Sequence, residues 1–138
     1  MPAEISPVTR ENSPVLRVLV VDDEPLIRWS LAETLKDMGH VAVEAGDGAS
    51  AIRALDAHAP FDAVVLDYRL PDSNDLTLLA AIRARAPKAA VVMMTAFGTP
   101  EVTSGAIALG AYRVVSKPFE MHDMAALVIQ ASRSATPA

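Results

Sequence analysis

Apolar and polar positions divide this chain into two alternating kinds of segment. Short runs of apolar residues, many of them β-branched, are too short for helices and predict strands. Between these runs, apolar residues recur at a spacing of three or four positions, which predicts helices with one buried face. The predicted strands cover residues 15–21, 41–45, 63–67, 90–95 and 112–115. This alternation predicts an α/β fold: a five-stranded parallel sheet, doubly wound as (βα)5, with helices on both faces.

Residues that favour helix termini support the predicted helices. Pro25 suits the first turn of the first helix, and Gly39 follows its end. Thr99 and Pro100 have the order of an N-cap and a first helical position, and Gly110 marks the end of that helix. The other helices are predicted at residues 49–57, 76–86 and 119–133.

Helical spacing also predicts which apolar side chains face the core. The predicted inward residues are Leu26, Ile27, Leu31, Leu35 and Met38 in the first helix, Ile52 and Leu55 in the second, Leu76, Leu79 and Ile82 in the third, Val102, Ala106 and Leu109 in the fourth, and Met121, Met124, Ala125, Val128 and Ala131 in the last. Three apolar residues, Ile107, Leu127 and Ile129, fall outside these stripes. One exposed apolar residue is ordinary, but a group on neighbouring helices favours a partner-binding surface.

Length and composition narrow the possible classes of protein. The chain has 138 residues, which fits one domain that forms its own core. Residues 15–133 form the predicted domain, residues 1–14 a disordered lead-in, and residues 134–138 a tail or the start of a linker. The absence of cysteine from the sequence excludes disulfides and thiol chemistry.

Charge and hydropathy indicate an ordinary acidic globular protein. Hydrophobic residues make up 51% of the sequence, charged residues make up 21%, and the net charge is −5. That charge argues against a nucleic-acid-binding surface in this chain. The sequence has neither the pattern of a signal peptide nor that of a membrane span, so we expect no membrane contact and a cytoplasmic location.

Polar side chains follow four of the five predicted strands. Asp22 and Asp23 come after the first strand, Asp67 ends the third, Thr95 ends the fourth and Lys117 comes just after the fifth. The carboxyl ends of parallel strands meet at one edge of a sheet, where ligands bind. Three carboxylates gathered there would repel one another unless a hard cation lay among them, and Mg²⁺ suits such a site.

This set of side chains predicts phosphoryl transfer to the protein itself. The metal and Lys117 would draw negative charge off a phosphoryl group, and the Thr95 hydroxyl would donate a hydrogen bond to it. Asp67 would then act as the nucleophile and form an aspartyl phosphate.

The four motifs that carry these groups resemble those of response-regulator receiver domains of two-component signalling. The motifs are Asp22-Asp23, Leu66-Asp67-Tyr68-Arg69-Leu70-Pro71, Thr95-Ala96 and Lys117-Pro118-Phe119. The resemblance covers residues 15–133 and implies the flavodoxin-like receiver fold. It implies that Asp23 and Asp67 bind Mg²⁺ directly, together with the backbone carbonyl of Arg69. It further implies that Asp22 acts mainly through water, and that the peptide bond before Pro118 is cis.

The resemblance also implies a function, that of a phosphorylation-dependent signalling switch. A sensor histidine kinase or phosphotransfer protein would supply the phosphoryl group, and the domain would assist its own phosphorylation and dephosphorylation without being a turnover enzyme. Phosphorylation would change the face formed by the fourth helix, fifth strand and fifth helix. That face, with Ile107, Leu127 and Ile129, would form a homodimer and control a partner or output domain. Residues 93–99 and 109–112 are similar to receivers of nitrogen-regulation-type AAA transcription activators, which suggests a link to transcription.

Two positions depart from the receiver pattern. Asp75 stands where receivers usually have a glycine, which puts in question the usual positive-φ turn there. Val114 stands where many receivers have a tyrosine or phenylalanine that swings inward on phosphorylation. A switch that depends on that ring cannot operate here in its usual form.

Three other functions share parts of this pattern. A flavin-dependent electron carrier would have the same architecture, but its first loop must cradle a phosphate, which the acids of residues 22–24 would repel. A phosphohydrolase of the haloacid-dehalogenase type resembles Asp-x-Asp after the first strand, whereas Asp22 and Asp23 are adjacent. A receiver fold that serves only as a binding module and is never phosphorylated is the third alternative.

Overall fold

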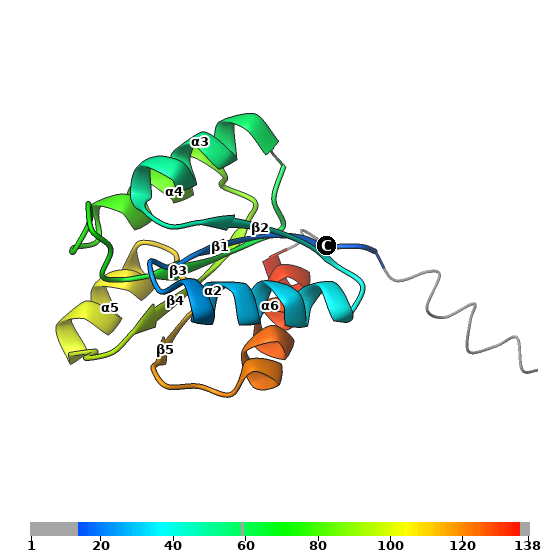
Figure 1. Ribbon diagram of the computed structural model, residues 1–138. Helices are drawn as coiled ribbons and strands as arrows, with labels where there is room; N and C mark the ends of the chain where they lie inside the picture. Colours follow the sequence, from blue (N-terminus) through cyan, green and yellow to red (C-terminus); the bar gives the residue numbers. More distant parts are fainter. Residues whose placement is uncertain (1–13, 59, 136–138) are drawn as a thin grey trace, which may run out of the picture.

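The sheet has the predicted architecture. The structure, a computed structural model, describes residues 14–58 and 60–135. Five parallel strands lie in the order β2-β1-β3-β4-β5, as Figure 1 shows. The strands are β1 (Arg17–Val21), β2 (Val41–Ala45), β3 (Ala63–Asp67), β4 (Ala90–Thr95) and β5 (Arg113–Ser116). The α/β, doubly wound fold is therefore confirmed.

Helices cover both faces of the sheet, and most begin and end where the sequence predicts. They are α2 (Pro25–Asp37), α3 (Gly48–His58), α4 (Thr77–Arg85), α5 (Pro100–Ala108) and α6 (Met121–Ala135). The Thr99 side chain caps α5 by accepting a hydrogen bond from the Val102 N–H at 3.2 Å. Gly39 and Gly110 follow α2 and α5 with φ angles of 93° and 102°, which only glycine adopts readily.

Some predicted boundaries differ from those in the structure. β1 begins at Arg17, so Val15 lies outside it and is exposed. α6 begins at Met121, two residues later than predicted, and continues to Ala135 into the predicted tail. Of the predicted lead-in, residues 1–13 lie outside the described part of the chain.

The core is formed on both faces of the sheet because successive residues of each strand point to opposite sides. In β3, Val64 and Leu66 belong to the apolar cluster covered by α3, α4 and α5. Ala63 and Val65 belong to the cluster covered by α2 and α6. All five residues of β3 are buried, which explains its continuous apolar run. Figure 1 shows these two helical layers on either side of the sheet.

Three residues that we predicted to face the core are exposed instead. Leu26 is 72% exposed, Met38 is 42% exposed and Leu109 is 41% exposed. Leu26 is the second residue of α2, while Met38 and Leu109 are the C-caps of α2 and α5. Helical spacing predicts the side of the helix on which a residue lies. It does not predict how far along the helix the sheet covers that side, and these three residues lie at helix ends.

The prediction that Leu127 and Ile129 lie off the core face is wrong. Both are half-buried and pack against the cluster under α2 and α6. Ile129 lines a pocket of about 630 Å³ together with Met38 and His40, on the α2 side of α6. Gln130 also lines this pocket, and its side chain donates a hydrogen bond to the Tyr112 hydroxyl at 3.3 Å.

Other expectations about single residues have clear outcomes. Ile107 is 47% exposed, as predicted. The peptide bond between Lys117 and Pro118 is cis, also as predicted. Asp75 does not take a positive φ; its carboxylate accepts a hydrogen bond from the Thr77 N–H at 2.9 Å at the start of α4. Among the described residues, no helix is long and apolar enough to cross a membrane.

Leu31 and Leu26 offer a matched test of the burial pattern in α2. Leu31→Ala is expected to lower the free energy of unfolding by about 2–5 kcal/mol, because Leu31 is fully buried and its loss leaves a cavity. Leu26→Ala should change it by less than about 0.5 kcal/mol, because that side chain is mostly exposed. Urea unfolding measures both values, and equal losses would contradict the packing described for α2.

Candidate functional site

The strand order creates a crevice at the carboxyl ends of β1 and β3. From β1 the chain passes to β2 on one side, then returns across β1 to form β3 on the other side. Val21 in β1 lies opposite Leu66 in β3, so the residues that follow them, Asp22 and Asp67, lie at the same edge. In open α/β sheets, ligands bind at this point of strand reversal.

The loop after β1 holds Asp22 in a buried position. The Asp22 backbone N–H donates to the Ala45 carbonyl at 3.1 Å, which extends the pairing of β1 with β2. Its Oδ1 accepts a hydrogen bond from the Glu24 N–H at 2.8 Å, which tightens the turn into α2. Arg28 donates to the Asp22 carbonyl oxygen at 2.9 Å and to the Glu44 carboxylate at 2.9 Å. These contacts fix Asp22 from both sides of the turn.

Asp67 is the last residue of the central strand β3 and is only 6% exposed. The next residue, Tyr68, still donates its N–H to the Met94 carbonyl at 2.8 Å, so the backbone remains in register with β4. The Arg69 N–H then donates to Asp67 Oδ1 at 3.2 Å. An open pocket of about 360 Å³ adjoins this carboxylate and is lined by Asp23, Glu24, Asp67, Arg69, Leu70, Pro71, Ala96, Phe97 and Lys117.

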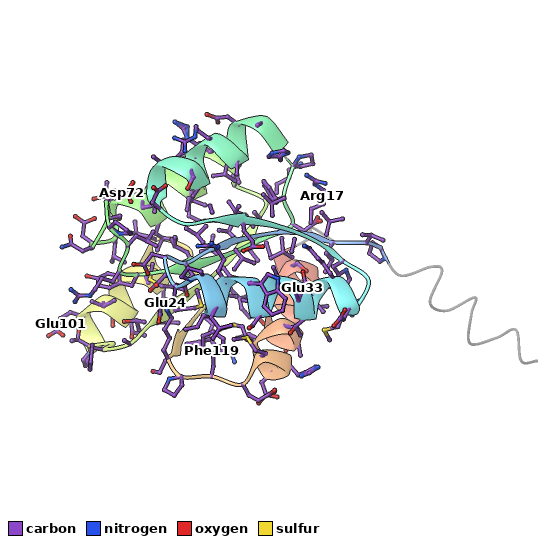
Figure 2. All side chains as sticks on the ribbon, viewed as in Figure 1. Arg17, Glu24, Glu33, Asp72, Glu101 and Phe119 are labelled. Atoms are coloured by element: carbon purple, nitrogen blue, oxygen red, sulfur yellow. The ribbon has the colours of Figure 1, made fainter. Side chains whose placement is uncertain are left out.

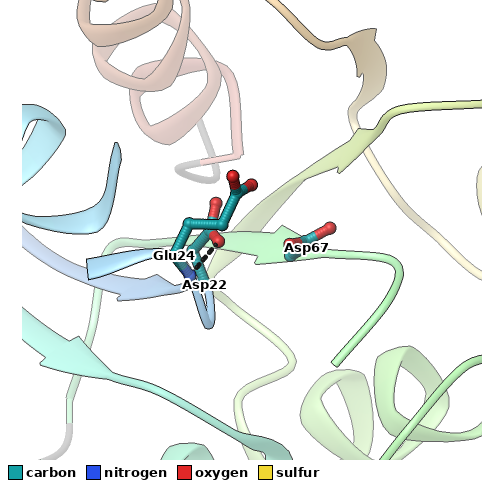
Figure 3. Close-up of side chains that lie close together, drawn as sticks. All are labelled: Asp22, Glu24 and Asp67. Atoms are coloured by element: carbon teal, nitrogen blue, oxygen red, sulfur yellow. Dashed lines mark hydrogen bonds between the residues drawn. The ribbon is translucent and has the colours of Figure 1, made fainter. Parts of the chain in front are cut away.

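The ammonium group of Lys117 lies among three carboxylates. Its Nζ is 2.7 Å from Glu24 Oε1, 2.9 Å from Asp22 Oδ2 and 3.1 Å from Asp67 Oδ2. One oxygen from each of these acids lies within 4.8 Å of the others. Figure 3 shows the three carboxylates drawn together from the ends of β1 and β3. Lys117 is placed by its own backbone, whose N–H donates to the Thr95 carbonyl at 2.9 Å.

The pKa values of Asp67 and Lys117 are both raised, but for different reasons. Burial raises the pKa of Asp67 to about 6, the Asp22 charge adds to the rise, and the hydrogen bond from Lys117 opposes it. Burial alone would lower the pKa of Lys117. Its close contacts with the carboxylates of Glu24, Asp22 and Asp67 outweigh that effect, so the pKa of Lys117 is raised. Lys117 therefore stays charged, and it favours the ionised form of Asp67.

The structure brings most of the predicted site residues together, but their roles differ in detail. Thr95 is buried at the end of β4, and its hydroxyl oxygen accepts a hydrogen bond from the Phe97 N–H at 3.3 Å. Asp23 is exposed and lines the pocket, but its carboxylate is not part of the close acidic group. Glu24 takes the third position in that group, which sequence reasoning missed. Its signal was the run of three consecutive acids, which cannot show which of them turns inward.

The donor set fits a hard divalent cation. The close group offers carboxylate oxygens from Asp22, Glu24 and Asp67, which are the ligands that Mg²⁺ prefers. Within the described residues, Asp22 Oδ2 is buried without a hydrogen-bond partner, although Lys117 Nζ lies 2.9 Å away. A buried carboxylate oxygen with unused acceptor capacity favours binding of a cation beside it.

Comparison with known proteins identifies relatives of this chain. Residues 18–129 match the family described as response regulator receiver domain. The response regulator protein PilR of Pseudomonas aeruginosa is 36% identical over 121 residues, which cover 88% of this chain and 27% of PilR. The DNA-binding transcriptional regulator NtrC of Escherichia coli is 35% identical over 114 residues, which cover 83% of this chain and 24% of NtrC. The chain thus spans about a quarter of the length of these relatives.

A solved structure supports the same assignment. The beryllofluoride-activated NtrC4 receiver domain dimer, determined in solution, is similar with a TM-score of 0.77 and 29% identity, covering 87% of this chain and 98% of that one. The similarity to NtrC and NtrC4 confirms the predicted resemblance to receivers of the nitrogen-regulation type. It also sets aside the flavin-dependent and haloacid-dehalogenase alternatives.

Replacing Lys117 tests the charge balance of the cluster. Lys117→Met should lower the free energy of unfolding by roughly 2 kcal/mol or more, because it leaves partly buried carboxylates without their counter-charge. Mg²⁺ should then raise the melting temperature of this variant more than that of the parent, since the cation supplies the missing positive charge.

Lys36→Met is the matched control, because within residues 14–58 and 60–135 Lys36 forms an ion pair with Glu33 alone, at 3.3 Å on the surface. Its loss should cost less than about 1 kcal/mol. Thermal unfolding with and without Mg²⁺ measures both variants. If they behaved alike, the Lys117 contacts would not stabilise the cluster.

Proposed function

Because the chain belongs to the family of response regulator receiver domains, we propose that it is a signalling switch controlled by phosphorylation of Asp67. A sensor histidine kinase or a phosphotransfer protein is the proposed donor. One observation carries the proposal: Asp67 ends the central strand beside an open pocket, with Lys117 Nζ 3.1 Å from its Oδ2. A carboxylate held in this way can be approached from the pocket while the sheet fixes its position.

The proposed chemistry follows from the placement of two side chains, Asp67 and Lys117. An Asp67 oxygen attacks the phosphorus, and an O–P bond forms while the P–N bond to the donor histidine breaks. The leaving histidine nitrogen keeps the electron pair of that bond. Lys117, already beside Asp67, pairs with the phosphoryl oxygens as they arrive. Hydrolysis later removes the phosphoryl group and returns the domain to its unphosphorylated state. The domain thus acts as a switch and is not a turnover enzyme.

Magnesium is part of this proposal. Asp23, Asp67 and the backbone carbonyl of Arg69 are the proposed ligands, with Asp22 acting through water. Asp23 and Arg69 both line the pocket beside Asp67, which supports their inclusion. When bound, the metal offsets negative charge on the phosphoryl group. Glu24, which the structure places in the acidic group, adds negative charge that favours a cation there.

Thr95 and α5 are the proposed first elements of the response. The Thr95 hydroxyl oxygen accepts the Phe97 N–H and can at the same time donate its own O–H to a phosphoryl oxygen, so a shift of Thr95 toward the phosphoryl group pulls on the loop that carries Phe97. A Cβ on Gly98 would lie 2.9 Å from Thr95 Cγ2, so the loop before α5 packs directly against the side chain that moves. Val114 has no ring to report the change, and we propose that α5 carries the signal largely alone.

The proposed output is a homodimer through α5, β5 and α6 that controls a partner or an output domain. Exposed Ile107 and half-buried Leu127 remain in the proposed face, whereas Ile129 is left out of it, because it lines the pocket beside Met38 on the α2 side. The similarity to the NtrC4 receiver dimer supports self-association. NtrC, a DNA-binding transcriptional regulator of greater length, supports a role in transcription and a cytoplasmic location. The net charge of −5 favours an output in which this chain itself does not contact nucleic acid.

Phosphorylation of Asp67 can be tested with a small phosphodonor such as acetyl phosphate and Mg²⁺. Asp67→Asn should abolish the phosphorylated species, because the amide cannot act as the nucleophile, while leaving the fold intact. Asp75→Asn is the control, since Asp75 is an exposed acid in the same loop and should leave labelling unchanged. Intact-mass spectrometry measures the product. Undiminished labelling of Asp67→Asn would refute the assignment, and no labelling of the parent would favour the unphosphorylated binding module.

Self-association tests the proposed output face. Ile107→Glu should weaken dimerisation of the beryllofluoride-treated chain by about tenfold or more, because it places a charge in an apolar contact. Met38→Glu is the control: Met38 has similar exposure, 42% against 47%, but lies near Ile129 on the other side of α6. Sedimentation velocity measures both. Equal effects, or a loss only in Met38→Glu, would place the interface elsewhere.

A further inference from the structure

The carboxylate of Asp72 joins the loop after Asp67 to the beginning of α3. Asp72 Oδ1 accepts a hydrogen bond from the Gly48 N–H at 2.7 Å, and Oδ2 accepts one from the Ala49 N–H at 3.0 Å. The first N–H groups of a helix have no partner within the helix, and a negative charge is favoured there. Figure 2 shows Asp72 beside the end of α3 that follows β2.

The beginning of α3 also has a local cap, Asp47, so Asp72 adds a second contact that comes from a distant part of the sequence. Asp47 Oδ1 accepts a hydrogen bond from the Ser50 N–H at 2.7 Å, and the Asp47 carbonyl accepts one from the Ala51 N–H at 3.1 Å. Asp72 therefore supplies acceptors for the two N–H groups that Asp47 does not reach. Its sequence distance from them is 24 and 23 residues.

The close approach of Asp72 depends on the small size of Gly48. A Cβ on Gly48 would lie 3.1 Å from Asp72 Oδ1 and 3.1 Å from Leu78 Cδ2. Both distances are shorter than an ordinary van der Waals contact, so a methyl group there would make the Asp72 and Leu78 side chains give way by a few tenths of an ångström. Gly48 is also buried, which leaves little room for the loop to shift.

Asp72 lies at the tip of a tight turn that begins beside the phosphorylation site. The Leu70 N–H donates to the Ser73 carbonyl at 2.7 Å, and the Ser73 N–H donates to the Leu70 carbonyl at 3.2 Å. Leu70 is 5% exposed and packs in the core, so it anchors the base of the turn. Arg69, which directly precedes Leu70, is exposed and lines the pocket beside Asp67.

We propose that Asp72 is a positioning residue whose two hydrogen bonds to α3 hold the Arg69 carbonyl ready for Mg²⁺. The inference rests on the proposed function, in which that carbonyl is a ligand. The chain from Asp67 to Asp72 is then fixed at three points: the end of β3, the buried Leu70 and the beginning of α3. Releasing the last of these lets the turn move and weakens the metal site. Because coupling between two sites is reciprocal, bound Mg²⁺ in turn strengthens the contact between Asp72 and α3.

The first test measures Mg²⁺ affinity of the full chain by isothermal titration calorimetry. Asp72→Ala should weaken binding by about tenfold or more, the range found for residues that orient metal ligands. Gly48→Ala should weaken it in the same direction while keeping the Asp72 charge, which separates positioning from simple loss of negative charge. Gly48→Ala also decides the question if Asp72→Ala fails to fold.

Two matched variants control for other effects of the substitution. Asp75→Ala removes an equal charge from the same loop but only a local bond to the Thr77 N–H. Asp47→Ala removes the local cap of α3 without touching the loop. Both should bind Mg²⁺ within about twofold of the parent, as expected for independent sites. If either weakened binding as much as Asp72→Ala, the effect would come from charge or helix stability, and the inference would be wrong.

The second test uses amide hydrogen exchange followed by NMR. In the parent, Mg²⁺ should slow exchange at Gly48 and Ala49, although neither residue lines the pocket beside Asp67. In Asp72→Ala, the metal should leave exchange at these two amides unchanged. A parent that binds no Mg²⁺ overturns the proposed metal site and this inference with it. A parent and an Asp72→Ala variant that bind Mg²⁺ equally overturn this inference alone.

Discussion

The ion pairs of Lys117 with three carboxylates hold the functional edge of this domain together. Asp22 is fully buried and Asp67 almost so, and two such charges could not remain side by side without a cation. Lys117 supplies that cation from the end of β5, and its contacts reach residues that follow β1 and end β3. Strands that are not adjacent in the sheet are therefore linked at their carboxyl ends. A change in the charge at Asp67 alters the forces on Lys117 and on the loops after β1 and β5.

The fold could be predicted from the sequence because its local signals agree with one another. Continuous apolar runs, caps such as Thr99 and glycines such as Gly39 all lead to the same alternation of strands and helices. The prediction failed for individual helix faces. Spacing gives the angle of a side chain around its helix but not the neighbour at that angle, so Ile129 could not be placed against α2. It also does not show where coverage by the sheet ends, which is why Leu26 was expected in the core.

The same limit applies to the candidate site. Strand ends fixed the general position of Asp22, Asp67, Thr95 and Lys117, since parallel strands end at one edge. Within a loop, however, adjacent residues point in directions that depend on local backbone angles. The sequence therefore could not show that Glu24 rather than Asp23 joins the close acidic group. The contact of Asp72 with α3 was equally hidden, because it joins a loop to the first residues of a helix that lie 24 and 23 positions away in the sequence.

The loop between Asp67 and α4 is braced by two different helices. On one side, Asp72 binds the beginning of α3. On the other, Leu76 packs so closely against α5 that a Cβ on Gly105 would lie 2.7 Å from Leu76 Cδ1. Close-packed contacts of this kind transmit displacement, because neither side can yield without opening a void or a clash. The residue proposed to receive the phosphoryl group is thus followed by a loop that contacts both α3 and α5 directly. Glycines at 48 and 105 let that loop lie close enough to both helices for this to happen.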